Sequence, residues 1–178
     1  MPHKIPVTLG FANHSGSDLD AMMSEDVAAL SPLFANVMVT PLGQTPRTSI
    51  LFLYAHLNEN GTLQKNPQSG IRQIVQMTGS PIIVLASPNS PASVQNAANL
   101  PGPKTANMIL TLERKNGGFA KFFRSLFEMM RDGEQMLTAW VTLAPQMPNA
   151  PPSAIPADIP ATILVAEAGN LKFPPPAS

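Results

Sequence analysis

Cysteine is absent from the 178-residue sequence, and charged residues make up only 12% of it. Without cysteine the chain has no disulfide, no thiolate nucleophile and no thiolate metal ligand. The eleven basic residues balance the eleven acidic ones and form no cluster, so we expect neither nucleic acid nor membrane as a partner. No apolar run approaches the roughly 18 residues of a membrane span, and the first residues lack the apolar stretch of a secretory signal. These absences predict a cytoplasmic protein.

The low charge content bears on self-association. Soluble domains usually carry charge on about a quarter of their residues, whereas here Asn, Gln, Ser, Thr and Pro supply the polar surface. Because the formal net charge is zero, little electrostatic repulsion keeps copies of the chain apart. The composition therefore favours a homo-oligomer or a permanent protein partner, with a neutral monomer as the alternative.

Short apolar runs alternate with helical patterns along the chain. Several runs are apolar at successive positions and rich in β-branched residues, which is typical of strands buried on both faces in a parallel sheet that helices cover. The runs occupy residues 7–12, 37–40, 50–55, 82–86, 108–112 and 163–166. We predict a single three-layer α/β domain over residues 1–170, with a mostly parallel sheet of about six strands and helices on both faces.

Helical segments lie between these runs. Ser17 stands where an N-cap residue is expected, and the acids Asp18 and Asp20 suit the first turn of the helix that follows. A phenylalanine stripe with helical spacing ends before Gly133, a helix stop. The expected helices cover residues 17–33, 70–79, 91 onward, 118–131 and 134–143.

Proline is concentrated in two later segments. Six prolines lie between residues 145 and 160, and we interpret this stretch as an irregular crossover that returns the chain to the sheet for its last strand. Residues 171–178 form a Pro-rich tail of polyproline type. We expect this tail to fray, with a recognition motif for proline-binding domains as the alternative.

The loop after the first strand is a candidate ligand site. The carboxyl ends of parallel strands share one edge of a sheet, and ligands of open α/β sheets bind there. Ser15-Gly16-Ser17 lies between this strand end and a helix, where backbone N–H groups can hold a phosphate. His14, Ser15 and Ser17 are therefore candidate ligand-binding residues for a small molecule or nucleotide. The loop contains no Lys or Arg, so helix capping is the alternative.

A histidine and a serine follow the third and fourth strands. If these strands are neighbours, His56 and Ser87 emerge side by side, as base and nucleophile of a serine-dependent hydrolase. Asn58 or Asn89 would orient the imidazole or donate to an oxyanion. No Gly-x-Ser-x-Gly elbow surrounds Ser87, and the alternative is a turn over residues 87–90 that caps the next helix.

Metal and cofactor sites have little support in the sequence. His14 and His56 would need Asp18 or Asp20 to complete a zinc or iron site, and no helical ligand spacing accompanies them. The glycines lack the spacing of a dinucleotide fingerprint. We prefer the interpretation that each histidine is hydrogen-bonded at a strand end, and we predict no metal and no cofactor.

One stretch of the chain carries a family resemblance. His56 ends a buried strand, and Ser87 ends the next one. A later helix contains the paired aromatics Phe122 and Phe123 and is followed by a glycine stop and another helix. This order, over about residues 50–143, resembles the caspase-like domains of the CHAT type, in which the first strand ends in histidine and the second in cysteine. The resemblance implies a caspase-like topology, with a flavodoxin-like strand order as the alternative.

The chain departs from that family at its catalytic positions. The family's histidine is normally followed by glycine, whereas Leu57 follows His56, and Ser87 or Pro88 stands in place of the cysteine. Cysteine peptidase activity is thereby excluded. The resemblance implies a non-catalytic pseudo-peptidase domain that binds a protein partner or itself. The serine hydrolase and the small-molecule binder remain the alternatives.

Overall fold

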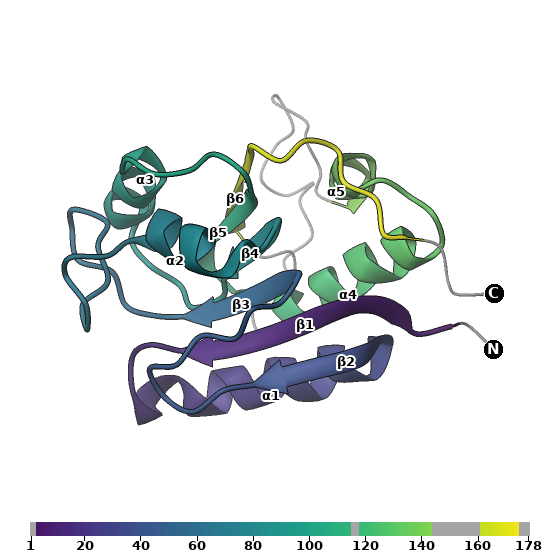
Figure 1. Cartoon of the computed structure of the whole chain (residues 1–178), viewed down its shortest axis with the longest axis horizontal. Helices are drawn as coiled ribbons and strands as arrows, with labels where there is room; N and C mark the ends of the chain where they lie inside the picture. Colours follow the sequence, from purple (N-terminus) through teal and green to yellow (C-terminus); the bar gives the residue numbers. More distant parts are fainter. Residues whose placement is uncertain (1–2, 115–117, 144–160, 175–178) are drawn as a thin grey trace.

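A single six-stranded sheet organises the computed structural model, which describes residues 3–114, 118–143 and 161–174 (Figure 1). The strands are β1 (Ile5–Asn13), β2 (Phe34–Val39), β3 (Ile50–Tyr54), β4 (Ile82–Leu85), β5 (Asn107–Glu113) and β6 (Ala161–Ala166). Their order is β2-β1-β3-β4-β5-β6. The first five run parallel to their neighbours, and β6 is antiparallel to β5. The mostly parallel sheet that the apolar runs predicted is confirmed.

Helices cover both faces of this sheet (Figure 1). On one face lie α1 (Asp20–Leu30), α4 (Gly118–Arg131) and α5 (Met136–Leu143), and on the other lie α2 (Ile71–Thr78) and α3 (Pro91–Asn99). The 3-10 turns η1 (Ser17–Leu19) and η2 (Ser31–Leu33) flank α1. The predicted three-layer α/β architecture is therefore confirmed.

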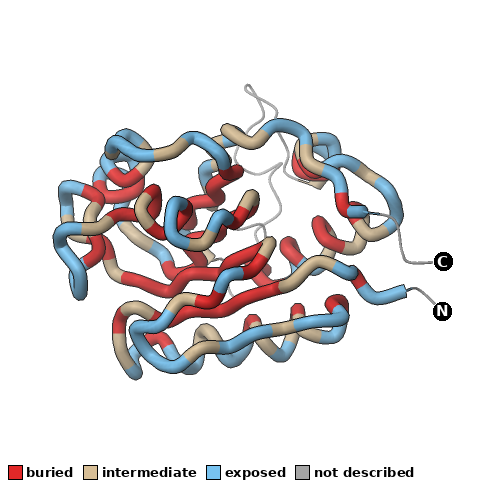
Figure 2. The backbone as a smooth tube through the Cα atoms, viewed as in Figure 1, coloured by how far each residue is buried: buried red, intermediate tan, exposed pale blue. Residues whose placement is uncertain are grey.

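Aromatic side chains of α4 fill the core on the first face. The ring of Phe123 lies edge-on to that of Phe52 in β3, with 5.3 Å between centroids, and Phe52 also contacts Phe11 of β1 at 5.5 Å. Successive strand residues point to opposite faces, so Leu51 and Leu53 enter a second core beneath α2 and α3. The central strands are consequently buried on both sides (Figure 2), which is why their sequences are apolar without alternation.

The chain between β2 and β3 lies directly against β1. A Cβ atom at Gly10 would lie 2.4 Å from Thr48 Oγ1 and 2.9 Å from Pro46 Cγ. Real Cβ atoms do not approach so closely, and glycine permits it because it has no side chain. This packing holds the β2–β3 loop on the same face of the sheet as α2.

Two local predictions are wrong. Ser17 does not cap a helix, because Gly16 occupies the N-cap position of η1 and no side chain accepts a hydrogen bond there. The beginning of the C-terminal tail does not fray, because Phe173 is only 8% exposed and its ring lies 6.2 Å from that of Phe127. Backbone hydrogen bonding anchors it further, since Met136 N donates to the carbonyl of Leu171 at 2.6 Å. The core thus extends to residue 173.

Other expectations concern segments that the structure does not describe. The crossover at about residues 145–160 and the last four residues of the Pro-rich tail lie outside the described residues. Within the described ranges, no helix is long and apolar enough to cross a membrane.

Candidate functional site

The chain reverses its direction of winding between β1 and β3. From β1 it passes through α1 on one face to the edge strand β2, and from β3 it passes through α2 on the opposite face to β4 (Figure 1). The loops that leave β1 and β3 therefore diverge at the carboxyl edge of the sheet. In open α/β sheets, such a reversal opens a crevice in which ligands bind.

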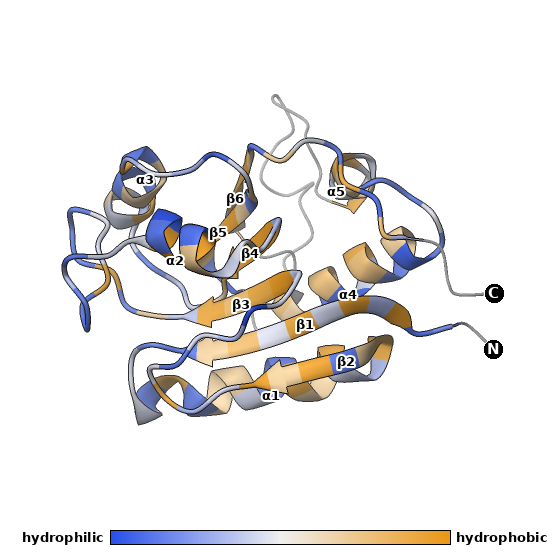
Figure 3. Ribbon diagram, in the orientation of Figure 1, coloured by the Kyte–Doolittle hydropathy of each residue, from blue (hydrophilic) through white to orange (hydrophobic). Residues whose placement is uncertain are grey.

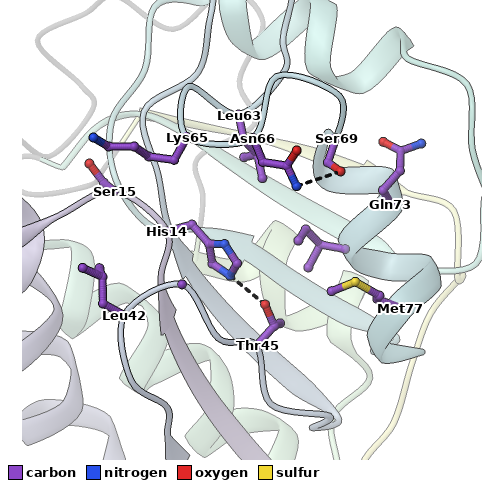
Figure 4. Close-up of a pocket in the computed structure, with 12 residues that line it drawn as sticks. His14, Ser15, Leu42, Thr45, Leu63, Lys65, Asn66, Ser69, Gln73 and Met77 are labelled. Atoms are coloured by element: carbon purple, nitrogen blue, oxygen red, sulfur yellow. Dashed lines mark hydrogen bonds between the residues drawn. The ribbon is translucent and has the colours of Figure 1, made fainter.

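A cavity of about 670 Å³ lies at this reversal (Figure 4). Its walls are the loop after β1, the β2–β3 loop, the β3–α2 loop and one side of α2. The volume falls within the roughly 300–1,000 Å³ of small-molecule pockets. The polar lining includes His14, Ser15, Thr45, Lys65, Asn66 and Ser69, and the apolar lining is Leu42, Leu63, Ile74 and Met77. Of the predicted ligand-binding residues, His14 and Ser15 thus line the cavity, whereas the exposed Ser17 does not.

His14 contributes a neutral imidazole to this cavity. The ring is half-buried, and burial lowers its pKa below the ordinary histidine value because the charged form loses hydration. Its Nε2 shares a hydrogen bond of 2.6 Å with Thr45 Oγ1, which fixes the ring against the β2–β3 loop (Figure 4). At neutral pH His14 is therefore a polar wall residue and not a cation.

Lys65 brings the positive charge. It lies in the β3–α2 loop, its residue is exposed, and within the described part of the chain it has no hydrogen bond or ion pair. No Asp or Glu is among the residues that line the cavity. The neighbouring Asn66 donates through Nδ2 to Ser69 Oγ at 3.2 Å, and no described hydrogen bond uses its side-chain oxygen Oδ1. The cavity therefore combines one unpaired cation with neutral polar groups and an apolar wall.

The backbone N–H groups after β1 are already bonded to the Asn13 side chain. Asn13 Oδ1 accepts from Ser15 N at 2.8 Å and from Gly16 N at 3.3 Å, while its Nδ2 donates to Gly16 O at 2.9 Å and to Asp20. These groups are the ones that a phosphate would need. The N–H groups of Ser15 and Gly16 are thus bonded within their own loop. No pattern in the sequence indicates this role for Asn13.

At the N-terminus of α2, the N–H group of Gly70 is also bonded to a side chain. Gly70 N donates to Gln73 Oε1 at 2.8 Å, so the helix caps its own first turn. The N–H groups of Ser15, Gly16 and Gly70 are therefore already bonded and are not available to a phosphate. The geometry consequently disfavours a nucleotide in this cavity.

His56 and Asp18 form a hydrogen-bonded pair beside the cavity. His56 Nε2 lies 2.5 Å from Asp18 Oδ2, and both side chains are well exposed. The hydrogen bond with His56 lowers the pKa of the Asp18 carboxyl. Ser15 Oγ, from the cavity lining, donates to the other oxygen of Asp18 at 3.3 Å. The pair therefore joins the loops after β1 and β3 and fixes the imidazole of His56.

Ser87 is fully buried, and its hydroxyl forms hydrogen bonds with the backbone at the C-terminal end of β3. Its Oγ donates to Ala55 O at 2.7 Å and accepts from Ala55 N at 2.9 Å. Asn89 extends this connection, because its Oδ1 accepts from Leu57 N at 2.9 Å and its Nδ2 donates to Ala55 O at 3.1 Å. These bonds hold the ends of β3 and β4 together.

The predicted catalytic residues do not form a catalytic arrangement. Among the described hydrogen bonds none joins His56 to Ser87 or to Asn58, whose Nδ2 instead donates to Thr62 Oγ1 at 3.0 Å. A buried hydroxyl with both bonding directions occupied cannot reach a substrate, so the geometry gives no support to a nucleophilic Ser87. The alternative role for residues 87–90 is confirmed, because Ser90 Oγ accepts from Ser93 N and caps α3.

The two histidines considered for a metal have separate partners. His14 bonds to Thr45 and His56 to Asp18, so each is a hydrogen-bonded histidine at a strand end, as preferred from the sequence. The residues that the structure describes contain no group of three or more His, Asp or Glu side chains that could hold an ion.

Sequence reasoning missed a buried ionic cluster on the opposite face of the sheet. Arg114, just after β5, holds both carboxylate oxygens of Asp26 at 2.8 and 2.9 Å, and Tyr54 donates to the same carboxylate at 2.5 Å. Burial raises the pKa of Asp26, although the Arg114 charge opposes this, and raises the pKa of Tyr54 well above its usual range. The guanidinium also lies 4.0 Å from the ring centroid of Phe119. The Asp26 carboxylate thus accepts hydrogen bonds from both Tyr54 and Arg114. These bonds link α1 to β3 and to the end of β5.

No protein-family model, curated protein or solved structure matches this chain. The assignment of a function therefore depends on the geometry of the chain's own residues.

Proposed function

We propose that the chain binds a small organic anion, a monocarboxylate with an apolar body, in the cavity between β1 and β3. The observation that carries this proposal is the lining itself, which has one unpaired lysine, several neutral polar groups, an apolar wall and no carboxylate. Such a composition suits a ligand with a single negative charge, because one ammonium compensates one carboxylate.

The apolar wall selects the body of the ligand. Leu63 and Ile74 are buried at the base of the cavity, and Met77 and Leu42 lie at its exposed margin. A ligand with an aliphatic chain or an aromatic ring would cover this surface and remove it from water. The nucleotide alternative has less support, because the N–H groups of Ser15 and Gly16 already bond to Asn13.

Titrations followed by NMR test this proposal. The probes are benzoate and hexanoate, with the neutral benzamide and hexanamide as matched controls and AMP for the nucleotide alternative. The carboxylates should shift the backbone signals of His14, Thr45 and Met77 and should bind more tightly than the amides. Equal binding of carboxylates and amides would contradict the role of the charge, and shifts confined to other parts of the chain would contradict the site.

Substitutions distinguish the effect of Lys65 on binding from a nonspecific effect of surface charge. Lys65→Gln should weaken benzoate binding about fivefold, since an exposed ion pair contributes up to about 1 kcal/mol. Leu42→Asp places a carboxylate at the 62%-exposed margin of the cavity and should weaken benzoate binding by a similar factor through repulsion. Lys4→Gln removes the same charge just before β1, at the opposite edge of the sheet, and should change nothing.

We also propose a non-catalytic relationship to the caspase-like domains. It is supported by the adjacent parallel strands β3 and β4, which lead into His56 and Ser87 in the order that the resemblance implies. A buried, doubly bonded Ser87 favours a pseudo-peptidase over a hydrolase. A fluorophosphonate probe, which labels activated serines, should leave the wild type unlabelled. Labelling that disappears in Ser87→Ala would overturn this interpretation and favour the hydrolase.

A further inference from the structure

Strand β2 is an edge of the sheet, and its outer side pairs with no strand in the described part of the chain. Its sequence, Phe-Ala-Asn-Val-Met-Val, contains no charge, proline or glycine. Natural edge strands usually carry a lysine, a proline or a bulge that prevents pairing with another chain. The irregularity of this pair lies in β1, between Ile5 and Thr8, and β2 stays regular through its partner positions. β2 therefore has none of these protections.

The hydrogen-bonding direction of each β2 residue follows from one contact. Thr40 N donates inward to Phe11 O of β1 at 3.3 Å. Because strand residues alternate in direction and β2 is regular, the N–H and C=O groups of Ala35, Val37 and Val39 point outward. These three residues form a ladder that is symmetric about Val37.

We propose that β2 pairs antiparallel with β2 of a second copy, about a two-fold axis at Val37. In this register Val37 faces its own copy, and Ala35 faces Val39 at both ends. All outward N–H and C=O groups then find partners, and the two sheets become continuous. A closed two-fold contact of this kind uses the same patch on both copies.

The side chains at this edge fit a second copy of the chain. Met38 and Val39 are 45% and 50% exposed, and Figure 3 shows the strand as mainly hydrophobic at the border of the sheet. The strand has no charge, so no like charges oppose one another across the two-fold axis. The zero net charge of the chain removes the longer-range repulsion as well. A partner with a charged strand would find no complementary group here, which favours self-pairing over capture of another protein.

Sedimentation velocity over a micromolar concentration series tests the proposal. The wild type should show a monomer–dimer equilibrium. Val39→Lys should weaken dimerisation at least about tenfold, because each dimer receives one lysine at either end of the paired strands. Val37→Pro removes an outward N–H without breaking the bonds to β1 and should do the same. The matched control is Val141→Lys, at a valine of α5 that is 59% exposed, and it should dimerise as the wild type does.

A disulfide trap fixes the register independently. The chain has no cysteine, so Val37→Cys carries a single thiol. Hydrogen-bonded antiparallel residues have Cα atoms about 5.5 Å apart, within the range of a disulfide. Mild oxidation should give a covalent dimer of Val37→Cys and not of Val141→Cys. A wild type that stays monomeric at all concentrations, or a dimer that persists in Val39→Lys and Val37→Pro, would overturn the proposal. Binding of an extended peptide to a monomeric wild type would likewise replace it with a different partner.

Discussion

Replacing Arg114 with methionine perturbs the buried ionic cluster in a way that the structure makes quantitative. The substitution keeps most of the side-chain volume but removes both hydrogen bonds to Asp26, which is fully buried, and leaves Tyr54 as its remaining partner. Removing one partner of a buried pair costs about 3–5 kcal/mol. The free energy of unfolding of a domain is about 5–15 kcal/mol. For a chain of this size, each kcal/mol of lost stability lowers the melting temperature by about 2–4 °C. The melting temperature should therefore fall by about 6–20 °C.

The pH dependence of this loss provides a second readout. Burial raises the pKa of Asp26 in the folded protein above its unfolded value, and the loss of Arg114 removes a charge that opposes the shift. The folded Arg114→Met variant therefore binds a proton that the unfolded chain releases. The contribution of Asp26 to its stability should be most favourable at acidic pH and should be lost as the pH rises through the folded-state pKa of this carboxyl. The deficit relative to the wild type should consequently shrink as the pH is lowered.

Urea denaturation of a matched series checks the reasoning. Arg114→Met, Asp26→Leu and Tyr54→Phe are measured singly and combined, because an apolar replacement of all three groups leaves no unpaired polar atom. The triple variant should be markedly more stable than the sum of its single losses implies. A loss below about 1 kcal/mol for Arg114→Met at neutral pH, or simple additivity in the triple variant, would refute the assignment of a buried, mutually dependent cluster.

Two further predictions concern the strand ends. Ser87→Ala leaves the Ala55 N–H without its partner while Asn89 still reaches the Ala55 carbonyl, so urea denaturation should show a loss of about 1–3 kcal/mol. For His14, burial depresses the folded-state pKa, so the unfolded chain binds protons first and stability falls as the pH drops below the ordinary histidine value. His14→Gln should flatten this part of the stability profile, and an unchanged profile would show that His14 does not cause it.

The apolar runs predict the sheet well, because burial on both faces leaves a local signal. In β3, Leu51 and Leu53 face one core while Phe52 and Tyr54 face the other, and the run 50–55 is apolar throughout for this reason. The spacing of the phenylalanines likewise predicts α4 to its ends. Parallel pairing follows from the helices between the strands, and it correctly predicts that the chain emerges from β3 and β4 side by side.

The site depends on segments that no local pattern connects. Thr45, Lys65 and Met77 lie in three different elements or loops and meet His14 only because the sheet reverses its winding between β1 and β3. The partner of a polar side chain is similarly a tertiary property. A serine at a strand end looks the same in sequence whether its hydroxyl faces solvent or, as at Ser87, bonds to the neighbouring strand.

The sequence by itself therefore determined the class of fold, the approximate extent of its elements and the absence of thiol chemistry. Only the tertiary structure decided that the buried Ser87 hydroxyl bonds to the neighbouring strand and that Asn13 occupies the N–H groups of its loop. It also decided that Lys65 lines a cavity without a carboxylate. The reason is physical: hydrophobic periodicity is encoded between near neighbours in the chain, whereas hydrogen-bond partners and cavities are set by residues that folding brings together from far apart.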